Sequence, residues 1–354
     1  MKFTCEKNAL VSAVSVASRT VAQKSTIPAL EGIYIRAGVK LTLSGYNLET
    51  GITISVDAEI QQTGACIMPS RLFFDIIRKL PDDTVSISVD EKFKVSIRGG
   101  ISSFTITAMS SEDYPELPEV ESDKGISLPQ NELKAMIGGT SFAVSENQAR
   151  PIHTGCLFEV EDTSITVVAV DGYRLALRRW KSEEPIGRTL KFVVPAAALK
   201  EAEKILGDTD DPCTFFLGSK HILFTIGEAT LVCRLLEGEF LDWRRVLPQN
   251  QPVKLAVNVA KMTDSIERVG LIISEKLKSP VRCKFGENTA DFRSVSTIGE
   301  AHDVCQIAGD GQDMEIGFNC RYLLDALRAI PDAECSLELI NGLSPIVMNP
   351  CDGS

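Results

Sequence analysis

The sequence has few of the residues and motifs that build catalytic and metal sites. Its three histidines, His153, His221 and His302, are scattered and lack ligand spacing. None of the ten cysteines falls in a C-x-x-C pair, so a zinc ribbon or a redox motif has no support. The glycine-rich loops that bind nucleotides and the G-x-S-x-G turn of hydrolases are also missing. These absences predict no metal, no cofactor and no catalytic residues, and they favour a binding or scaffolding role.

Long apolar runs are missing as well. No stretch approaches the roughly 18 apolar residues that a membrane helix needs, and the segment Met1–Thr4 lacks the basic-then-apolar layout of a signal peptide. Most cysteines lie within apolar runs, as Cys156 and Cys233 do. Such placement is typical of small buried side chains in a reducing compartment. We therefore expect a cytoplasmic protein with no membrane partner.

Length and charge set further limits. A chain of 354 residues with 44% apolar residues is expected to form two or three domains. Its formal net charge of −11 argues against a protein that binds nucleic acid with its whole surface. A local basic surface on an acidic body remains compatible with that charge.

A long internal repeat organises the chain. Three segments share one pattern, in which a helix of about three turns is followed by an acidic turn and a strand of alternating apolar residues. The helices begin near Arg71, Ala198 and Arg321, which are 127 and 123 residues apart. The strands that follow them are predicted at Thr84–Val89, Cys213–Leu217 and Cys335–Leu339. This spacing is too long for a solenoid and suits three copies of one domain.

Each copy is also predicted to open with a helix, over Asn8–Val21, Gln130–Phe142 and Val257–Ile273. Alternating segments between and after the two helices, such as Ser164–Val170 and Ser102–Thr107, predict antiparallel strands. The sequence thus predicts an α+β fold of three tandem copies, each with two helices packed on antiparallel sheets. Acidic, proline-bearing joints place the domains at residues 1–120, 121–249 and 250–354.

Basic residues recur on these helices although the chain is acidic. Three pairs, one in each copy, are four or seven positions apart and so share a helix face: Arg71 and Arg78, Lys200 and Lys204, Arg321 and Arg328. The opening helices add Lys134, Lys261 and Arg268. A solvated helix face is the alternative for any single helix, but recurrence in three copies favours one positive surface. Contacts to phosphates alone bind DNA without reading its sequence.

Several stretches resemble the bacterial DNA sliding clamp, the beta subunit of DNA polymerase III, in order along the whole chain. The most specific are Asp171-Gly172-Tyr173-Arg174-Leu175-Ala176 and the segment Phe240–Pro248, and the others are Met1–Thr4, Thr26–Leu30, Phe73–Ile76 and Asp113–Leu117. The resemblance implies a head-to-tail homodimer whose domains form a ring around duplex DNA. It also implies a clamp loader, a tethered replicative polymerase and further partners that carry a clamp-binding motif.

The resemblance further implies a peptide-binding pocket, for which the matching positions are His153, Val170, Gly172, Tyr173, Arg174, Leu175, Leu241, Arg245 and Val246. An apolar groove edged by arginines suits an extended peptide with Leu or Phe anchors and an acidic or polar flank. Lys24 and Arg71 match basic positions of the family, and Asn147 and Arg150 lie on a loop expected to face the channel. Phe104 and Ile106, with Ile272 and Ile273, match the two sides of the ring seam. The sequence ends about where a last strand and a C-terminal tail follow in the family, so domain three is expected to lack its last strand.

Two other functions stay open at this point. The chain could be an adaptor that binds only peptides and never surrounds DNA. Alternatively, Asp171 could belong to an unrecognised hydrolase or lyase site, although a tight turn between strands is favoured for Asp171-Gly172.

Overall fold

The computed structural model describes residues 1–121, 124–273 and 279–351. By its internal contacts the chain divides into two compact units. Unit one comprises residues 1–137 and 192–237, and unit two comprises residues 138–191 and 238–354. The predicted central copy contributes to both units.

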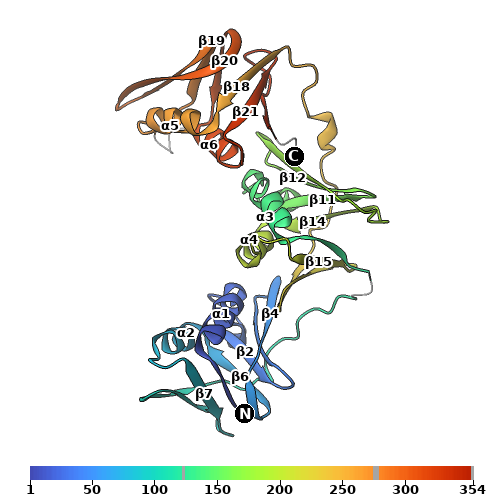
Figure 1. Ribbon diagram of the computed structural model, residues 1–354, viewed down its shortest axis with the longest axis vertical. Coiled ribbons are helices and arrows are strands. Elements are labelled where there is room, and N and C mark those ends of the chain that lie inside the picture. The colour runs from blue at the N-terminus through green and yellow to red at the C-terminus, as the bar shows by residue number, and fades with distance from the viewer. Residues whose placement is uncertain (122–123, 274–278, 352–354) are drawn as a thin grey trace. The chain divides into compact units, whose positions relative to one another are not determined.

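Six α-helices occur within the described residues, two in each predicted copy (Figure 1). They are α1 Lys7–Ala17, α2 Ser70–Lys79, α3 Gln130–Gly138, α4 Ala196–Ile205, α5 Val259–Gly270 and α6 Cys320–Arg328. Short 3₁₀ turns are η1 Ser18–Thr20, η2 Pro28–Glu31, η3 Ser141–Ala143, η4 Pro151–Thr154 and η5 Trp243–Arg245. All six predicted helices are therefore confirmed. Among the described residues no helix is both long and apolar enough to cross a membrane.

The strands of unit one form two antiparallel sheets, ordered β5-β1-β7-β8-β9 and β10-β15-β16-β17-β4-β3-β2-β6. Their bounds are β1 Lys2–Glu6, β2 Gly32–Ala37, β3 Leu41–Tyr46, β4 Thr50–Val56, β5 Glu59–Gln62, β6 Gly64–Pro69, β7 Thr84–Val89, β8 Lys94–Gly99, β9 Ser102–Thr107, β10 Ile126–Pro129, β15 Pro212–Leu217, β16 His221–Ile226 and β17 Ala229–Arg234. In the larger sheet, β17 of the second copy pairs with β4 of the first, with Leu231 opposite Ile52. This sheet therefore joins two copies through backbone hydrogen bonds.

Unit two contains a sheet in which β12 lies between β11 and β13, and a second sheet ordered β19-β20-β18-β21-β22. The bounds are β11 Gly155–Glu161, β12 Ser164–Val170, β13 Leu175–Lys181, β18 Val253–Asn258, β19 Val281–Ser296, β20 Gly299–Phe318, β21 Glu334–Leu339 and β22 Val347–Pro350. A further strand, β14, spans Leu190–Pro195 at the point where the chain passes from unit two to unit one. Strand β22 pairs with β21, and the expected lack of a last strand stays a prediction.

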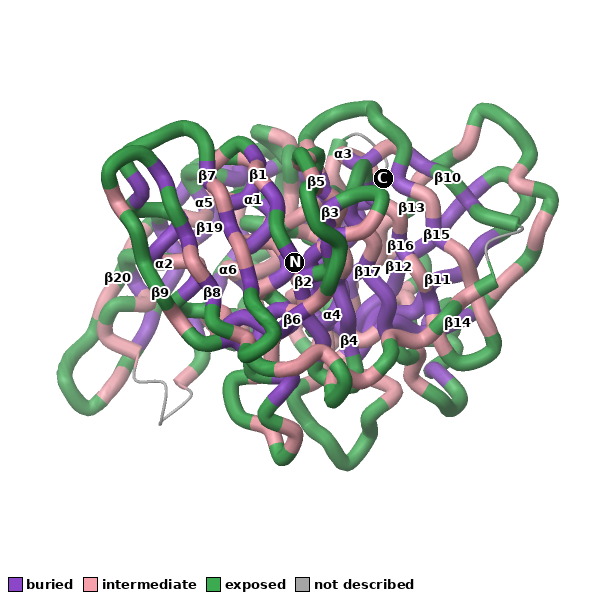
Figure 2. The backbone as a smooth tube through the Cα atoms, turned by 90° about the horizontal axis from the view of Figure 1, so that it is seen from below, coloured by how far each residue is buried: buried purple, intermediate pink, exposed green. Residues whose placement is uncertain are grey.

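The helix pairs of the first and third copies each cover a core of their own copy. In the first copy, α1 contributes Leu10 and Val14, and α2 contributes Phe73 and Ile77, all fully buried against the sheets. In the third copy, α5 and α6 cover a separate cluster in the same way. Figure 2 shows buried residues along the strands and exposed residues in the loops. The apolar period of each helix thus leaves its basic residues on the opposite, exposed face.

The helix ends differ from the predicted ones for local reasons. Helix α1 ends at Ala17 rather than Val21, because the Ser18 hydroxyl donates back to Val14 O at 2.6 Å and a 3₁₀ turn follows. Helix α3 ends at Gly138, since glycine has low helix propensity. Helix α5 begins two residues later than predicted, because Asn258 caps it by accepting from Lys261 N at 3.0 Å. The sequence also gave no sign that β20 would span 20 residues.

Eight of the ten cysteines are buried, Cys320 is half-buried and Cys351 is exposed; all ten are free thiols. Burial raises the pKa of Cys66 and Cys213 to about 12, so these thiols are inert at neutral pH. The predicted role of the cysteines as small buried apolar side chains is confirmed for these eight.

Gly45 on β3 provides a test of the packing in unit one. A methyl group at this position would overlap the carbonyl oxygen of Ala17 at the end of α1. We expect Gly45→Ala to lower the free energy of unfolding by about 3 kcal/mol, since backbone atoms cannot yield as a side chain would. Urea unfolding followed by circular dichroism measures the change. The matched control is Gly38→Ala, whose new methyl group meets no atom closer than 3.9 Å; an equal loss in the control would contradict this account.

Candidate peptide-binding surface and nucleic-acid interface

The Asp171–Arg174 segment is a tight turn between β12 and β13. The Asp171 carboxylate accepts from the backbone N–H groups of Tyr173, at 2.8 Å, and Arg174, at 3.0 Å. Gly172 has a φ of +94°, which favours glycine. Tyr173 is therefore pushed outward, with 86% of its surface exposed. The predicted turn is confirmed, and the Asp171 carboxylate is fully used in forming it.

The Arg174 guanidinium is paired with three acceptors and one aromatic ring of the same chain. Its guanidinium donates to Asp171 Oδ2 at 3.0 Å, to Asp325 Oδ2 at 2.8 Å and to the Phe142 carbonyl at 2.6 Å. It also lies over the ring of Tyr322, 4.2 Å from the centroid. Only 14% of the side chain is exposed. Arg174 thus joins the turn of the second copy to helix α6 of the third. Its guanidinium is mostly buried and does not project into solvent.

Asp325, Phe142 and Tyr322 were not singled out from the sequence. Asp325 lies 151 residues from Arg174, and no spacing rule connects the two. Tyr322 also lies beside Tyr173, with 6.2 Å between the ring centroids. Two exposed or partly exposed tyrosines therefore flank the turn.

The Phe240–Val246 segment holds the second group of residues predicted for the pocket. Phe240 is buried and packs edge-on against His153, with ring centroids 5.3 Å apart. Trp243 in η5 is also buried, and its indole N–H donates to Glu159 Oε2 on β11 at 3.1 Å. The residues between and after these anchors point outward. Leu241 is 37% exposed and Val246 is 46% exposed, and Arg245 is mostly exposed and pairs with Asp242 at 3.0 Å.

The predicted pocket residues thus fall into two groups of unit two, one at the Asp171–Arg174 turn and the other in the Phe240–Val246 segment together with His153. Val170 and Leu175 face each other across β12 and β13, with Val170 buried and Leu175 half-buried. The turn residues and the Phe240–Val246 segment supply the exposed apolar and aromatic side chains. An apolar surface with a few fixed polar groups is the usual composition of a peptide site.

The pKa of His153 is held below its ordinary value of 6.5, first because the imidazole is partly buried and second because Arg150 lies nearby. The imidazole is therefore neutral at neutral pH. The folded state binds this proton less readily than the unfolded state does. The free energy of unfolding is therefore unaffected by His153 above pH 6.5, and it falls as the pH drops from 6.5 through the lowered pKa.

Nine of the basic residues predicted to face DNA lie on the helices, and six of these nine contact carboxylates. The ion pairs are Arg78–Asp75, Lys134–Asp208, Lys204–Glu201, Arg268–Asp303, Arg321–Glu146 and Arg328–Glu267. Arg71, Lys200 and Lys261 are exposed and make no ion pair with the described residues. Such exposed pairs are weak, contributing about 0–1 kcal/mol each, so the paired side chains remain able to exchange partners.

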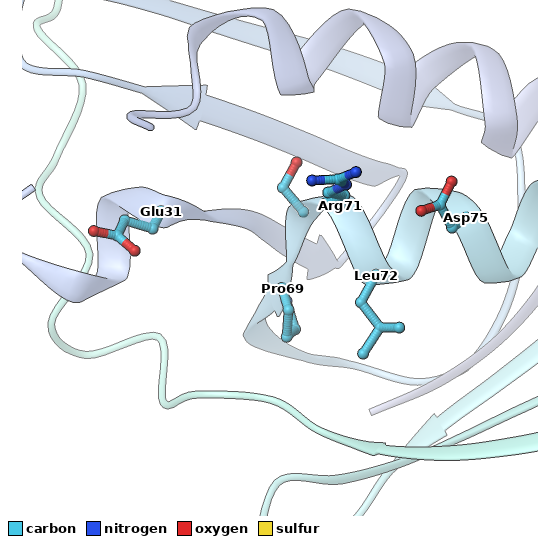
Figure 3. Close-up of a pocket in the computed structure, with 6 residues that line it drawn as sticks. Glu31, Pro69, Arg71, Leu72 and Asp75 are labelled. Carbon is cyan, nitrogen blue, oxygen red and sulfur yellow. The ribbon is translucent and has the colours of Figure 1, made fainter. Parts of the chain in front are cut away.

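Arg71 borders a shallow hollow of about 460 Å³ at the start of α2, lined also by Glu31, Pro69, Ser70, Leu72 and Asp75. Figure 3 shows Arg71, Leu72 and Asp75 on α2, with Glu31 on the facing segment. Lys24 is exposed between η1 and η2. Asn147 and Arg150 are exposed on the loop before η4, which is fixed by the bond from Ala149 N to the Asn147 side chain at 2.9 Å.

The four residues predicted for the seam between subunits differ in exposure. Phe104 is 41% exposed on β9, an edge strand of its sheet. Ile106 and Ile273 are only partly buried and pack against the cores of the first and third copies. Ile272 is half-buried, and its neighbour Leu271, which was not predicted to lie at the seam, is 82% exposed.

No group of three or more His, Cys, Asp or Glu side chains in the described parts of the chain is placed to hold a metal ion.

Comparison with known families assigns the whole chain. Residues 1–118 match the N-terminal domain of the DNA polymerase III beta subunit, residues 127–242 its central domain and residues 244–354 its C-terminal domain. The three matches follow one another along the chain in the order of the three predicted copies.

Individual relatives agree with this assignment. The beta sliding clamp of Staphylococcus epidermidis is 32% identical, over 99% of this chain and 96% of the relative. The crystal structure of a putative DNA polymerase III beta subunit from Eubacterium rectale has a TM-score of 0.93 and 32% identity, covering 100% of this chain and 96% of that one. The DNA polymerase sliding clamp of Bacillus subtilis has a TM-score of 0.93 and 30% identity with the same coverage.

Replacing Arg150 tests the cause of the His153 shift. We expect Arg150→Gln to raise the pKa of His153 without restoring its ordinary value, because burial is the larger cause. Proton NMR titration of the imidazole, assigned with His153→Gln, measures the midpoint. A midpoint unchanged by Arg150→Gln would show that the arginine does not act on this ring.

Replacing Arg174 by lysine tests its role as a junction. A lysine lacks the fork that reaches three acceptors, so we expect the free energy of unfolding to fall by about 2 kcal/mol. The matched control is Arg245→Lys, at an exposed arginine with one ion pair, which we expect to change stability by less than about 0.5 kcal/mol. Urea unfolding measures the stability of both variants. Equal losses of stability would refute the claim that Arg174 holds the second and third copies together.

Proposed function

The chain belongs to the family of the DNA polymerase III beta subunit, the bacterial sliding clamps, and from this premise we propose that it encircles duplex DNA and tethers the replicative polymerase there. Its function is that of a processivity clamp without catalytic activity. The observation that carries the proposal is the succession of three family domains along the whole chain. The adaptor that never surrounds DNA is thereby disfavoured, and the Asp171 carboxylate is already engaged in its turn.

We assign DNA contact to the basic helix faces. The candidates are Lys24, Arg71, Arg78, Lys134, Asn147, Arg150, Lys200, Lys204, Lys261, Arg268, Arg321 and Arg328. Their side chains extend from helices and loops and suit phosphates rather than base edges, so binding is independent of sequence. An acidic body with basic helices restricts DNA to these helix faces, which is compatible with the net charge of −11.

A head-to-tail homodimer of chains with domains at 1–120, 121–249 and 250–354 would close the ring. The edge strand β9 has an unpaired side among the described strands and carries the exposed Phe104, which supports a contact there. Ile106, Ile272 and Ile273 are assigned to the same seam, and the exposed Leu271 strengthens the domain-three side.

We assign recruitment of partners to the surface around the Asp171–Arg174 turn and the Phe240–Val246 segment. Its residues are His153, Val170, Gly172, Tyr173, Arg174, Leu175, Leu241, Arg245 and Val246. Exposed Tyr173, Leu241 and Val246 suit apolar anchors, and Arg245 suits an acidic or polar flank. The replicative polymerase, a clamp loader and other proteins with a clamp-binding motif are the proposed partners.

Solution mass and retention on DNA test the ring. We expect a dimer mass by sedimentation and, after loading by the cognate clamp loader, retention on circular plasmid with loss from linearised plasmid. Free ends release a ring but not a surface-bound protein. A monomer retained equally on both plasmids would refute encirclement.

Charge reversal tests the helix faces. We expect Arg71→Glu, Lys200→Glu and Lys261→Glu together to weaken binding to duplex DNA and to reduce its salt dependence by about one unit of slope for each residue replaced. The matched control reverses Lys92, Lys220 and Arg282, which lie on turns and strands and change the net charge equally. Filter binding at several salt concentrations measures both; an equal effect in the control would contradict the helix-face assignment.

A further inference from the structure

Glu159 on β11 is a buried carboxylate with three donors. It accepts from the Trp243 indole N–H at 3.1 Å, from the Arg244 guanidinium at 2.8 Å and from Lys191 Nζ at 3.2 Å. The residue is 8% exposed. Burial alone raises the pKa of a carboxyl group, but these three hydrogen bonds outweigh it and hold the pKa of Glu159 below its usual value. Glu159 is therefore ionised at neutral pH.

The two donors from the Phe240–Val246 segment, Trp243 and Arg244, pack against each other. The Arg244 guanidinium lies over the Trp243 ring, 4.2 Å from its centroid. Both side chains turn toward the sheet, and both end on the same oxygen, Glu159 Oε2. Glu159 thus fixes both side chains of this segment to β11.

The same segment carries exposed residues on either side of this anchor. Leu241 precedes it, and Arg245 and Val246 follow it. Arg245 N also donates to Asp242 O at 3.2 Å, which makes the segment a single turn. The direction in which these exposed side chains point therefore depends on the placement of Trp243 and Arg244.

We infer that Glu159 is a positioning residue of the peptide-binding surface, holding the Trp243–Arg244 pair so that Leu241, Arg245 and Val246 meet the anchor residues of a partner peptide. This inference rests on the proposed function, which assigns peptide binding to that surface. The inference also assigns a role to Trp243 and Arg244 of the Phe240–Pro248 segment, whose side chains turn toward Glu159 and are not among the predicted peptide contacts. Fixed supporting contacts of this kind determine how accurately a site is formed.

Glu161, two positions along β11, provides a matched control. It lies on the same side of the strand and pairs with Arg244 at 3.4 Å, but it is exposed and has no bond to Trp243. If only charge near Arg244 matters, both carboxylates are equivalent. If the buried anchor matters, only Glu159 affects peptide binding.

The experiment measures binding of a fluorescein-labelled short peptide that ends in Leu-Phe and is otherwise made of Gln, Ser and Asp. Fluorescence anisotropy gives its affinity for the full-length protein and for Glu159→Ala, Glu159→Gln and Glu161→Gln. We expect about tenfold weaker binding for Glu159→Ala, a smaller loss for Glu159→Gln, whose amide oxygen still accepts from Trp243, and no change for Glu161→Gln.

Two further readouts separate positioning from general damage. In a Trp180→Phe background Trp243 is the sole tryptophan, and we expect its emission to shift to the red in Glu159→Ala as the indole becomes exposed. Retention on circular DNA should stay unchanged, since the helix faces do not depend on this anchor.

The inference is overturned if Glu159→Ala binds the peptide as tightly as the unchanged protein, if Glu161→Gln loses as much affinity, or if DNA retention falls together with peptide affinity. Failure of the unchanged protein to bind the peptide would instead refute peptide binding by this surface, and the role of Glu159 with it.

Discussion

The first and third copies each bury their own apolar residues, so something other than a common core must join them to the second copy. Between the first and second copies this is backbone pairing, because β4 and β17 are neighbours in one eight-stranded sheet. Between the second and third copies it is Arg174, whose guanidinium takes acceptors from a turn, a 3₁₀ segment and helix α6. The first junction is a row of backbone hydrogen bonds beside side-chain contacts such as Lys40–Glu228. The second is made by side chains, with Arg174 at its centre and Arg321 pairing with Glu146.

The Arg174 junction also fixes the turn that carries part of the proposed peptide surface. A partly buried guanidinium is stable only when its donors are paired, so the turn and helix α6 must stay together. Tyr173 and Tyr322 are consequently held on neighbouring segments, with their rings 6.2 Å apart. Exposed Tyr173 thus lies on a turn held by paired polar contacts, and such a preorganised anchor would lower the cost of binding a flexible partner.

The sequence predicted the helices and many strands because apolar periodicity is a local property. Thr84–Val89 and Ser164–Val170 were predicted with the bounds that the structure has. The turn at Asp171-Gly172 was equally local, since a carboxylate that caps its own backbone needs no distant partner. Helix ends were less predictable, because they depend on single hydrogen bonds such as Ser18 to Val14.

The contacts of the candidate site were not predictable in the same way. Glu159 and Trp243 are 84 residues apart, and a lone Glu in an apolar strand gives no sign of which side chains reach it. Asp325 was not singled out from the sequence, because its bond to Arg174 depends on how two copies pack. The three-fold repeat predicted the basic helix faces, but it could not predict which basic residues form ion pairs with carboxylates.

That pairing bears on how a clamp would hold DNA. Arg328 and Lys204 already have carboxylate partners at 2.6 Å and 2.7 Å, so a phosphate would have to replace an existing ion pair. The net gain from each such exchange is small, because the old and new pairs are both exposed and screened by salt. Arg71, Lys200 and Lys261 have no partner to give up among the described residues, and each would add a full phosphate contact. A surface of many weak, exchangeable contacts and a few stronger ones attracts DNA without fixing its position, which is the property that sliding requires.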